Sequence, residues 1–378
     1  MSCNYAEGLS PYANKGVLGV PEKFDSLEKL NTKCQLLAQL ISEAEHVVVH
    51  TGAGISTSAG IPDFRSPNGV WTLERQGKKP ENDTSFVDAV PTKTHMILKK
   101  LVECNKVQYI VSQNIDGLHL KSGLQRKYLA ELHGNMFIDQ CKLCQRQFVR
   151  STPVETVGKR SSGVPCAAEL VSGRPCRGRL YDIVLDWEHS LPRNDFAMAT
   201  WHSCVADLSI CLGTTLQIMP SCDIPLETVK YGGKLVICNL QPTKHDNKAD
   251  LTINYYVDVI LEKVMSILNI DIPTYCEDEN PIKKARSAMI EWTIDNRDML
   301  QIEKLWKDKC KGVKKNKVLI KKRNSTEVTG NEVTDDKSKI IKLEVKEEVS
   351  DDKSKIIKVD VKQEVIDDVD VKQEITEN

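Results

Sequence analysis

The spacing of apolar residues changes within the first fifty positions of the chain. Between residues 27 and 44 the apolar side chains recur at helical spacing, at Leu30, Cys34, Leu37, Ala38 and Ile41. Residues 46–50 then form a dense run with three consecutive valines. This change of pattern predicts an amphipathic helix followed by a buried strand.

Short β-branched runs recur further along, at residues 107–112, 208–212 and 235–239. Each run is bounded by helical or glycine-bearing segments. Strands that alternate with helices favour a parallel sheet covered on both faces. We therefore predict an α/β fold in which a doubly wound parallel sheet forms the main domain.

Residues 141–179 interrupt this alternation, because they are rich in Cys, Gly, Pro and Arg and poor in long apolar periods. We interpret them as an inserted module. Cys141 and Cys144 form a C-x-x-C pair, and Cys166 and Cys176 follow. Four thiolates can hold tetrahedral zinc and leave no position open for water, so the metal would be structural. The alternative is four unrelated buried thiols.

After about Tyr275 the chain becomes strongly charged. Residues 285–309 suggest a helix, followed by a basic cluster at Lys314, Lys315, Lys317, Lys321, Lys322 and Arg323. Residues 335–342 then recur as residues 351–358, with no aromatic side chains to build a core. We therefore expect an N-terminal segment at 1–26, a catalytic domain at 27–275 with the module at about 136–182, and a largely disordered tail at 276–378.

Composition narrows the choice of partners and compartment. The 378 residues include 52 basic and 53 acidic ones, so the net charge is close to zero. The electrostatic field of the whole chain therefore does not favour nucleic acid or a membrane as a partner. We expect no secretory signal and no membrane span, because neither pattern is present. The thirteen cysteines should therefore be mostly reduced thiols, as in cytosol and nucleus.

The first predicted strand leads into a glycine-bearing turn at residues 51–60. Gly52 and Gly54 allow a close backbone approach, and Ser56 and Thr57 suggest the start of a helix that would favour a pyrophosphate. Thr57 stands where the dehydrogenase fingerprint has its third glycine, and no ribose-binding acid follows, so hydride transfer is disfavoured. The alternative is a tight structural turn.

Polar side chains follow the next segments. The proline-bounded loop 61–67 carries Asp63, Phe64 and Arg65, which could bind a phosphate or ribose and shield a reactive carbon, or simply pack. Gln113, Asn114 and Asp116 follow the second strand, at the sheet edge where ligands bind. They suit a carboxamide, although a turn that caps the next helix is an equal alternative.

His133, followed by Gly134, is the best candidate for a general base. His46 and His50 flank an apolar strand and His119 lies in a helix-like stretch, so these are more simply packed or surface residues. Two more strand ends, at residues 212–215 and 238–241, suggest a rim for ribose and adenine.

Taken together and in order, these motifs resemble the sirtuin family. The resemblance covers about residues 16–275, and residues 66–72, 185–188 and 239–246 are similar to its sirtuin six type. It implies a Rossmann-like domain with a small zinc module, and a cleft where NAD meets an acyl-lysine. Thr215 stands where the family usually has serine, and Tyr256 stands where a glycine is expected.

The resemblance implies an NAD-dependent protein-lysine deacylase that releases nicotinamide and acyl-ADP-ribose. His133 would deprotonate a ribose hydroxyl, with Asn114 and Asp116 near the nicotinamide. Residues 183–187, namely Ile183, Val184, Leu185, Asp186 and Trp187, would pair with the substrate peptide as an added strand. The expected NAD contacts are Gly52, Ala53, Gly54, Ser56, Thr57, Asp63, Phe64, Arg65, Trp71, Gln113, His133, Gly213, Thr214, Thr215, Asn239, Leu240, Gln241 and Val257.

The sirtuin six type also implies a nuclear, chromatin-bound enzyme that acts on histone H3 tails. Long-chain deacylase and mono-ADP-ribosyltransferase activities are further expectations from this resemblance. The basic cluster fits nuclear import or contact with nucleosomal DNA. Lys346, Lys362 and Lys372 match a SUMO acceptor pattern. The competing hypotheses are an ADP-ribosyltransferase that uses the same NAD site and a non-catalytic chromatin-binding module.

Overall fold

The computed structural model describes residues 2–81, 84–170, 172–324, 343–348 and 356–361. The chain divides into two compact units, residues 1–317 and 318–378. The repeat at 335–342, most of its second copy, and the SUMO motifs at Lys362 and Lys372 lie outside the described residues.

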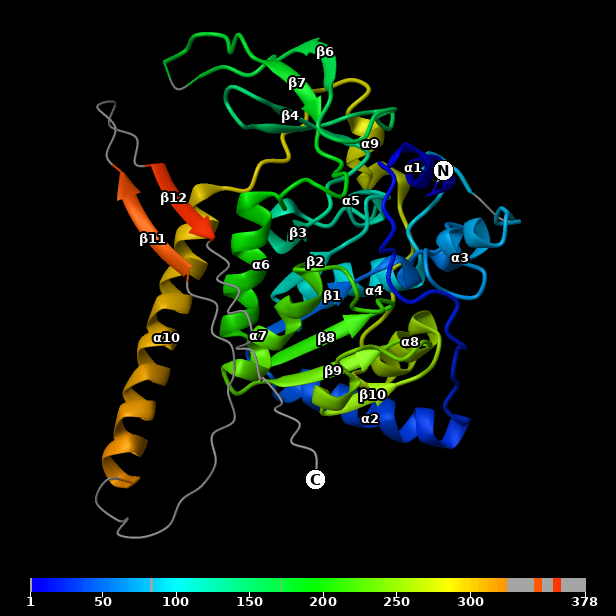
Figure 1. Cartoon of the computed structure of the whole chain (residues 1–378), viewed down its shortest axis with the longest axis vertical. Helices are drawn as coiled ribbons and strands as arrows, with labels where there is room; N and C mark the ends of the chain where they lie inside the picture. Colours follow the sequence, from blue (N-terminus) through cyan, green and yellow to red (C-terminus); the bar gives the residue numbers. More distant parts are fainter. Residues whose placement is uncertain (1, 82–83, 171, 325–342, 349–355, 362–378) are drawn as a thin grey trace, which may run out of the picture. The chain divides into compact units, whose positions relative to one another are not determined.

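A six-stranded sheet forms the centre of the first unit, in the order β10-β9-β8-β1-β2-β3 (Figure 1). Every pair of neighbouring strands is parallel, which confirms the predicted α/β class. In the centre, Val49 of β1 pairs with Ile110 of β2 and Ile210 of β8. The strands are β1 Val47–Thr51, β2 Tyr109–Ser112, β3 Leu129–Glu131, β8 Leu208–Leu212, β9 Lys234–Cys238 and β10 Leu251–Ile253.

Helices cover both faces of this sheet. Val47 and Val49 share one apolar cluster with α2, α4 and α8, whereas Val48 lies in a second cluster with α6 and the start of α7. The side chains of β1 therefore alternate between two buried layers. The helices are α1 Ser2–Gly8, α2 Leu27–Glu43, α3 Val70–Arg75, α4 Lys93–Glu103, α5 Leu118–Lys121, α6 Arg193–Val205, α7 Ile224–Lys230, α8 Val257–Ile267, α9 Pro281–Lys284 and α10 Asn296–Asn324.

The predicted helix at 27–44 and the strand after it are confirmed. Helix α2 buries the five apolar residues that defined the pattern, Leu30, Cys34, Leu37, Ala38 and Ile41. The side chain of Ser26 caps its first turn by accepting a hydrogen bond from the Lys29 amide. None of the described helices is long and apolar enough to cross a membrane.

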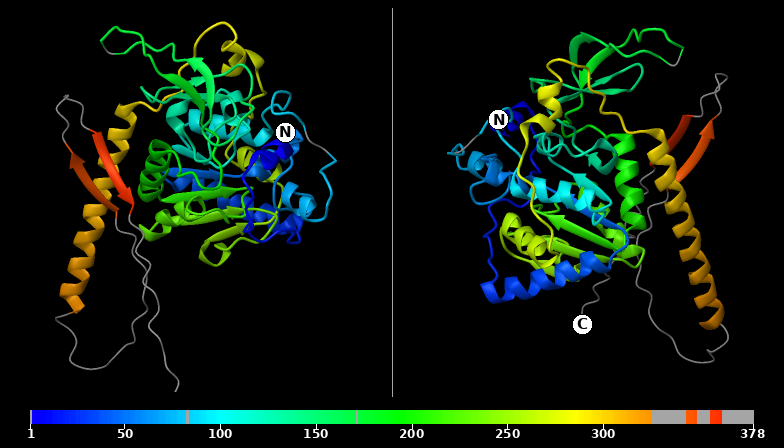
Figure 2. Two further views of the ribbon diagram at one scale, coloured as in Figure 1. Left: turned by 45° about the horizontal axis from the view of Figure 1, so that its top comes forward. Right: turned by 180° about the vertical axis from the view of Figure 1, so that it is seen from behind.

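The inserted module is a separate antiparallel sheet between β3 and α6 (Figure 2). Its strands are β4 Ile138–Cys141, β5 Gln147–Val149, β6 Ser161–Pro165 and β7 Arg179–Asp182, in the order β5-β4-β7-β6. The core of the module consists of the four cysteines with Phe148, Ala168 and Leu180. Because this apolar cluster is small, we expect a bound metal to contribute much of the module's stability.

Core packing continues past Tyr275, where we expected the catalytic domain to end. The indole nitrogen of Trp292 donates to Glu131 at 2.9 Å, and Arg126 donates to the Trp292 carbonyl at 2.9 Å. Ile282 and Ile302 are also buried. The helix expected at 285–309 begins only at Asn296, because residues 290–292 pair with β5. The division into domains stays a prediction.

The basic cluster lies on the last turns of α10. In the second unit, β11 Leu343–Glu348 pairs antiparallel with β12 Ile356–Val361, and Lys346 lies in β11. The described residues also form six short 3₁₀ turns, η1 Ala53–Ile55, η2 Thr57–Ala59, η3 Arg126–Tyr128, η4 Ser221–Asp223, η5 Asp246–Lys248 and η6 Glu277–Glu279.

Candidate active site and zinc site

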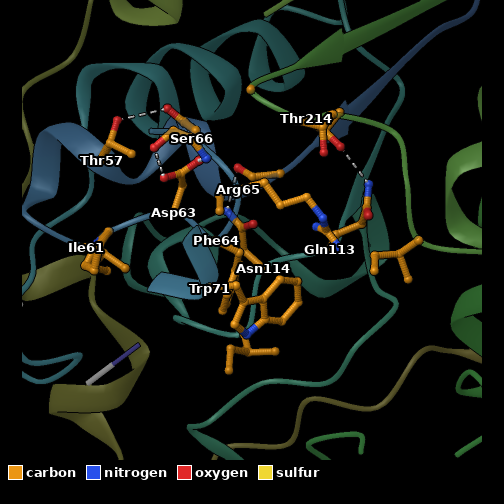
Figure 3. A pocket seen from close by; sticks show the side chains of 18 of the residues that line it. Thr57, Ile61, Asp63, Phe64, Arg65, Ser66, Trp71, Gln113, Asn114 and Thr214 are labelled. Atoms are coloured by element: carbon orange, nitrogen blue, oxygen red, sulfur yellow. Dashed lines mark hydrogen bonds between the residues drawn. The ribbon is translucent and has the colours of Figure 1, made fainter. Parts of the chain in front are cut away.

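A cavity of about 750 Å³ opens at the carboxyl ends of β1, β2, β8 and β9 (Figure 3). This is the edge of a parallel sheet at which ligands bind. Most of the predicted site residues line it, although they come from segments up to two hundred positions apart. They are Gly52, Ala53, Gly54, Thr57, Asp63, Phe64, Arg65, Trp71, Gln113, Asn114, His133, Leu185, Asp186, Trp187, Gly213, Thr214, Thr215, Asn239, Leu240, Gln241 and Val257.

The backbone after β8 lies so close to the turn after β1 that Gly52 and Gly54 have no room for a side chain. The Gly54 amide donates to the Gly213 carbonyl at 2.9 Å. A Cβ on Gly54 would lie 2.8 Å from the Cα of Gly213, and one on Gly52 would lie 2.7 Å from its carbonyl oxygen. The expected start of an α-helix here is wrong, because only the 3₁₀ turns η1 and η2 follow. Tight packing of two strand ends therefore explains both glycines.

Arg65 supplies a buried cation to the cavity. Its side chain is 8% exposed, its Nε donates to the Lys15 carbonyl at 3.0 Å, and its guanidinium lies 4.6 Å from the centre of the Trp71 ring (Figure 3). Burial lowers the pKa of Arg65 to about 10, so it stays charged at neutral pH. Nη2 has no hydrogen-bond partner among the described residues. A buried, unpartnered donor of this kind fits a phosphate of NAD.

Asp63 organises the loop that carries Arg65. Its carboxylate accepts hydrogen bonds from the amide of Ser66 at 3.0 Å and from the Ser66 hydroxyl at 2.5 Å. Burial raises the pKa of Asp63. The carboxylate is therefore already engaged in holding the loop, which supports the packing interpretation for this residue.

The polar residues after β2 fall into two layers. On the cavity wall, Gln113 Nε2 donates to the Thr214 hydroxyl at 3.3 Å (Figure 3) and Asn114 Nδ2 donates to the Gly52 carbonyl at 3.0 Å. Ser56 and Asp116 do not line the cavity. They bond to each other at 2.7 Å behind it.

Asp116 also accepts a hydrogen bond from the Leu118 amide at 2.9 Å, at the start of α5. Burial raises its pKa. Both interpretations of the segment thus hold in part, since Asp116 accepts from the first amide of α5 while Gln113 and Asn114 line the cavity. A catalytic role for Asp116 stays a prediction.

His133 presents an unprotonated nitrogen beside the cavity. Its Nδ1 lies 3.0 Å from the Gln113 carbonyl oxygen, which can only accept, so Nδ1 carries the proton. Nε2 then accepts a hydrogen bond from the Ser221 hydroxyl at 3.2 Å. Burial and the nearby charge of Arg65 lower the pKa of His133 to about 4, against the opposing effect of the Gln113 carbonyl. The imidazole is therefore neutral and available as a base.

Gly134 is the second place where a glycine is required. Its φ is +89°, and a Cβ there would lie 2.1 Å from the carbonyl oxygen of Ile183. The close approach brings residues 183–185 against His133, so that the Leu185 amide donates to the His133 carbonyl at 3.1 Å. The glycine thus allows the expected peptide-binding segment to lie beside the expected base.

Two of the other histidines considered, His50 and His119, are buried and packed, as the simpler interpretation predicted. His50 lies 3.2 Å from the Ser209 hydroxyl, and His119 lies 3.1 Å from the Thr51 hydroxyl. Burial lowers the pKa of each to about 3. Neither of them lines the cavity.

The segment expected to bind substrate peptide, residues 183–187, follows β7 and is already partly engaged. Leu185, Asp186 and Trp187 line the cavity, whereas Ile183 and Val184 do not. The Tyr5 hydroxyl donates to the Leu185 carbonyl at 3.3 Å, and the Tyr12 ring stacks 4.6 Å from Trp187. An added peptide strand would therefore compete with the N-terminal segment. This pairing stays a prediction.

Two contributors to the site were absent from the sequence-based prediction. Ser221 lies in η4, far along the chain from its partner His133, and Tyr5 lines the cavity from α1. No local pattern marks either residue, because each is brought to the site by tertiary packing alone.

The four cysteines of the module fit a zinc ion. The sulfur of Cys141 lies 3.7 Å from that of Cys176, and the sulfur of Cys144 lies 3.8 Å from that of Cys166. A tetrahedron with zinc–sulfur bonds of about 2.3 Å has edges of about 3.8 Å. All four sulfur atoms lie within 4.8 Å of one another, and all four residues are free thiols. The predicted ligand set is thus assembled.

Comparison with known proteins gives consistent matches. The model of the Sir2 family matches residues 52–88 and 78–220. The chain is 62% identical over 296 residues to the NAD-dependent protein deacetylase Sirt6 of Drosophila melanogaster, covering 78% of this chain and 93% of that protein. It is 45% identical over 302 residues to the NAD-dependent protein deacetylase SRT1 of Oryza sativa subsp. indica, covering 78% and 61%.

A solved structure described as "Sir2-p53 peptide-NAD+" also aligns with the chain. The TM-score is 0.48 at 28% identity, over 63% of this chain and all of that one.

Proposed function

The chain belongs to the Sir2 family and is an NAD-dependent protein deacetylase, and from this premise we propose that it acts on acylated lysines of histone tails in the nucleus. NAD is its co-substrate, and an acylated protein lysine is the other substrate. One observation carries the chemical part of this proposal. The buried cation of Arg65 and the imidazole of His133, whose Nε2 is unprotonated, line the same cavity.

The chain's own residues divide the work by position. Arg65 would bind a phosphate, and Gln113 and Asn114 would orient the nicotinamide end of NAD. His133 Nε2 would take a proton from a ribose hydroxyl, a contribution of roughly 10² to 10⁴ in rate. The aromatic rings of Phe64 and Trp71, whose centres lie 4.6 Å apart, would exclude water from the reacting carbon.

Zinc would stay outside the chemistry. Cys141, Cys144, Cys166 and Cys176 would hold it, and four thiolates leave no open coordination position. The ion would supply folding energy to the small module, which has few apolar residues of its own.

The histone and nuclear parts of the proposal rest on the basic cluster. Six Lys and Arg residues fall within ten positions, 314–323, on the last turns of α10. Such a cluster attracts DNA phosphates and so would bring the enzyme to nucleosomes. The same NAD site would also serve the removal of long-chain acyl groups from lysine and the transfer of ADP-ribose to protein.

The test uses the full-length protein, NAD and a histone H3 peptide carrying one acetylated lysine, in parallel with a long-chain acylated copy. Free lysine with nicotinamide and acyl-ADP-ribose supports deacylation, whereas ADP-ribosylated protein indicates transfer. If neither product forms while the protein still binds nucleosomes, an enzymatic role is contradicted and a chromatin-binding module is favoured. An acetylated peptide unrelated to histones is the control, and equal rates on both peptides would contradict the histone preference.

A further inference from the structure

A second cluster of metal-ligating side chains lies outside the zinc module. Cys222 and Asp223 belong to η4, after β8, and His245 immediately precedes η5, after β9. One ligand atom from each of the three lies within 4.8 Å of the other two. Cys222 is completely buried and His245 is 5% exposed, whereas the side chain of Asp223 is 41% exposed. The cluster therefore has two buried donors and one that reaches solvent.

The distances within the cluster are close to those of a metal site. The Asp223 Oδ1 lies 2.9 Å from the His245 Nε2 and 3.5 Å from the Cys222 sulfur. In a zinc tetrahedron the oxygen–nitrogen and oxygen–sulfur edges are about 3.4 Å and about 3.6 Å. An ion could enter if the imidazole moved outward by about 0.5 Å. Three ligands would leave a fourth position for water.

A cation already occupies the open side of this cluster. The ammonium of Lys244 lies 3.2 Å from the Asp223 Oδ1, and its side chain is 40% exposed. It can therefore turn into solvent when a divalent ion replaces it at the carboxylate. His245 now donates from Nε2, since the carboxylate only accepts, and its Nδ1 has no partner among the described residues. The hydrogen bond to Asp223 thus sets this tautomer, and an ion that replaces it at Nε2 leaves Nδ1 to carry the proton.

We propose that Cys222, Asp223 and His245 form a second, regulatory site for a zinc-like divalent ion beside the NAD cavity. On binding, the Cys222 thiol becomes a thiolate and releases its proton to water, while the imidazole proton moves from Nε2 to Nδ1. One proton is thus released for each ion bound. The fourth ligand is a water molecule.

The position of the site links it to catalysis, a step that rests on the proposed function. Ser221 precedes Cys222 and donates to the expected base, His133. Met219, two residues before Ser221, lines the cavity. An ion that enters must widen the gap between Asp223 and His245, and this displaces η4, which carries Ser221 at the His133 imidazole and adjoins the cavity wall. Occupation of the site therefore slows deacetylation.

The test titrates Co²⁺, without oxygen, into the full-length protein that already holds one zinc. The wild type should bind one further ion and develop the charge-transfer and d–d absorption of four-coordinate, thiolate-bound cobalt. Cys222→Ser should lose the charge-transfer band, and His245→Gln should bind at least tenfold more weakly. Cys276→Ser, which removes an exposed cysteine outside the cluster, should match the wild type.

Circular dichroism and the content of the first zinc show whether each variant is folded, and the two variants test the site independently. A wild type that takes up no second ion, or a Cys222→Ser variant that retains the band, would overturn the site. These readouts do not depend on enzymatic activity. Added Zn²⁺ should then lower wild-type turnover at least threefold and leave Cys222→Ser unaffected, and equal sensitivity of the two would overturn the regulatory role.

Discussion

The hydroxyl of Ser221 donates a hydrogen bond to Nε2 of His133 across 3.2 Å. The bond engages the lone pair that would accept a substrate proton. Protonation of the imidazole must break it, so it favours the neutral form of His133 together with burial.

We expect Ser221→Ala to raise the pKa of His133, because the neutral form loses a hydrogen bond. The acid limb of the pH profile of kcat/KM should move to higher pH. His133→Ala, in contrast, should lower turnover by at least roughly 10² with zinc content unchanged. Ser190→Ala, at an exposed serine, is the control. An unchanged acid limb in Ser221→Ala would show that the bond does not influence the base.

Arg65→Met should weaken NAD binding at least tenfold, because the buried cation with a free donor is the feature that fits a phosphate. Calorimetric titration with NAD measures this directly. Arg75→Met, on the exposed side of α3, should bind like the wild type. If the two variants bound NAD equally well, Arg65 would not be a phosphate ligand.

Removal of zinc should unfold the small module and leave the main sheet folded. Metal binding of this kind contributes on the order of 10 kcal/mol, more than a core of three apolar side chains can replace. Cys176→Ser should lose zinc and the hydrogen-exchange protection of residues 138–182. Cys104→Ser, at an exposed thiol, should lose neither. Retained protection without zinc would contradict a structural role for the ion.

Gly54→Ala should lower the free energy of unfolding by roughly 1–3 kcal/mol, because the new methyl group meets the backbone of Gly213. Gly312→Ala is the matched control, since nothing lies within 4 Å of its Cβ position in α10. Chemical denaturation compares the two variants. A neutral Gly54→Ala would mean that the β1 and β8 ends are less tightly packed than the structure shows.

The stability of the fold should fall as the pH falls from about 6.5 toward 4. Burial lowers the pKa of His50 and His119 to about 3 and of His133 to about 4 in the folded state. The unfolded chain therefore binds more protons in this window, and each such histidine lowers stability by up to about 1.4 kcal/mol per pH unit. Denaturation series between pH 4 and pH 8 measure the slope. The double variant His50→Gln, His119→Gln should show a shallower slope, and an unchanged slope would contradict the assignment of the pH dependence to these histidines.

Features that depend on local pattern could be predicted from the sequence. The helical spacing of apolar residues from Leu30 to Ile41 predicted helix α2, and the consecutive valines after it predicted β1. The C-x-x-C pair marked the zinc module, and the polar residues at strand ends marked the cavity edge, because parallel strands bring their carboxyl ends together.

Features that depend on distant packing could not be predicted. The turn after β1 has 3₁₀ rather than α-helical geometry, because its glycines pack against Gly213. Trp292 joins the main core through a hydrogen bond to Glu131, in a segment whose charge suggested a tail. Ser221 and Tyr5 reach the site across about ninety and one hundred and eighty residues. Such contacts leave no periodicity in the chain.

The backbone contact between Gly54 and Gly213 has a consequence for protein synthesis. About one hundred and sixty residues separate the two glycines, so a ribosome must translate far beyond the first turn before its partner exists. A nascent chain that ends in the zinc module has all of β1 and β2 but no β8 to close the pocket floor. Prematurely terminated chains of that length should therefore neither retain dinucleotide nor turn over substrate.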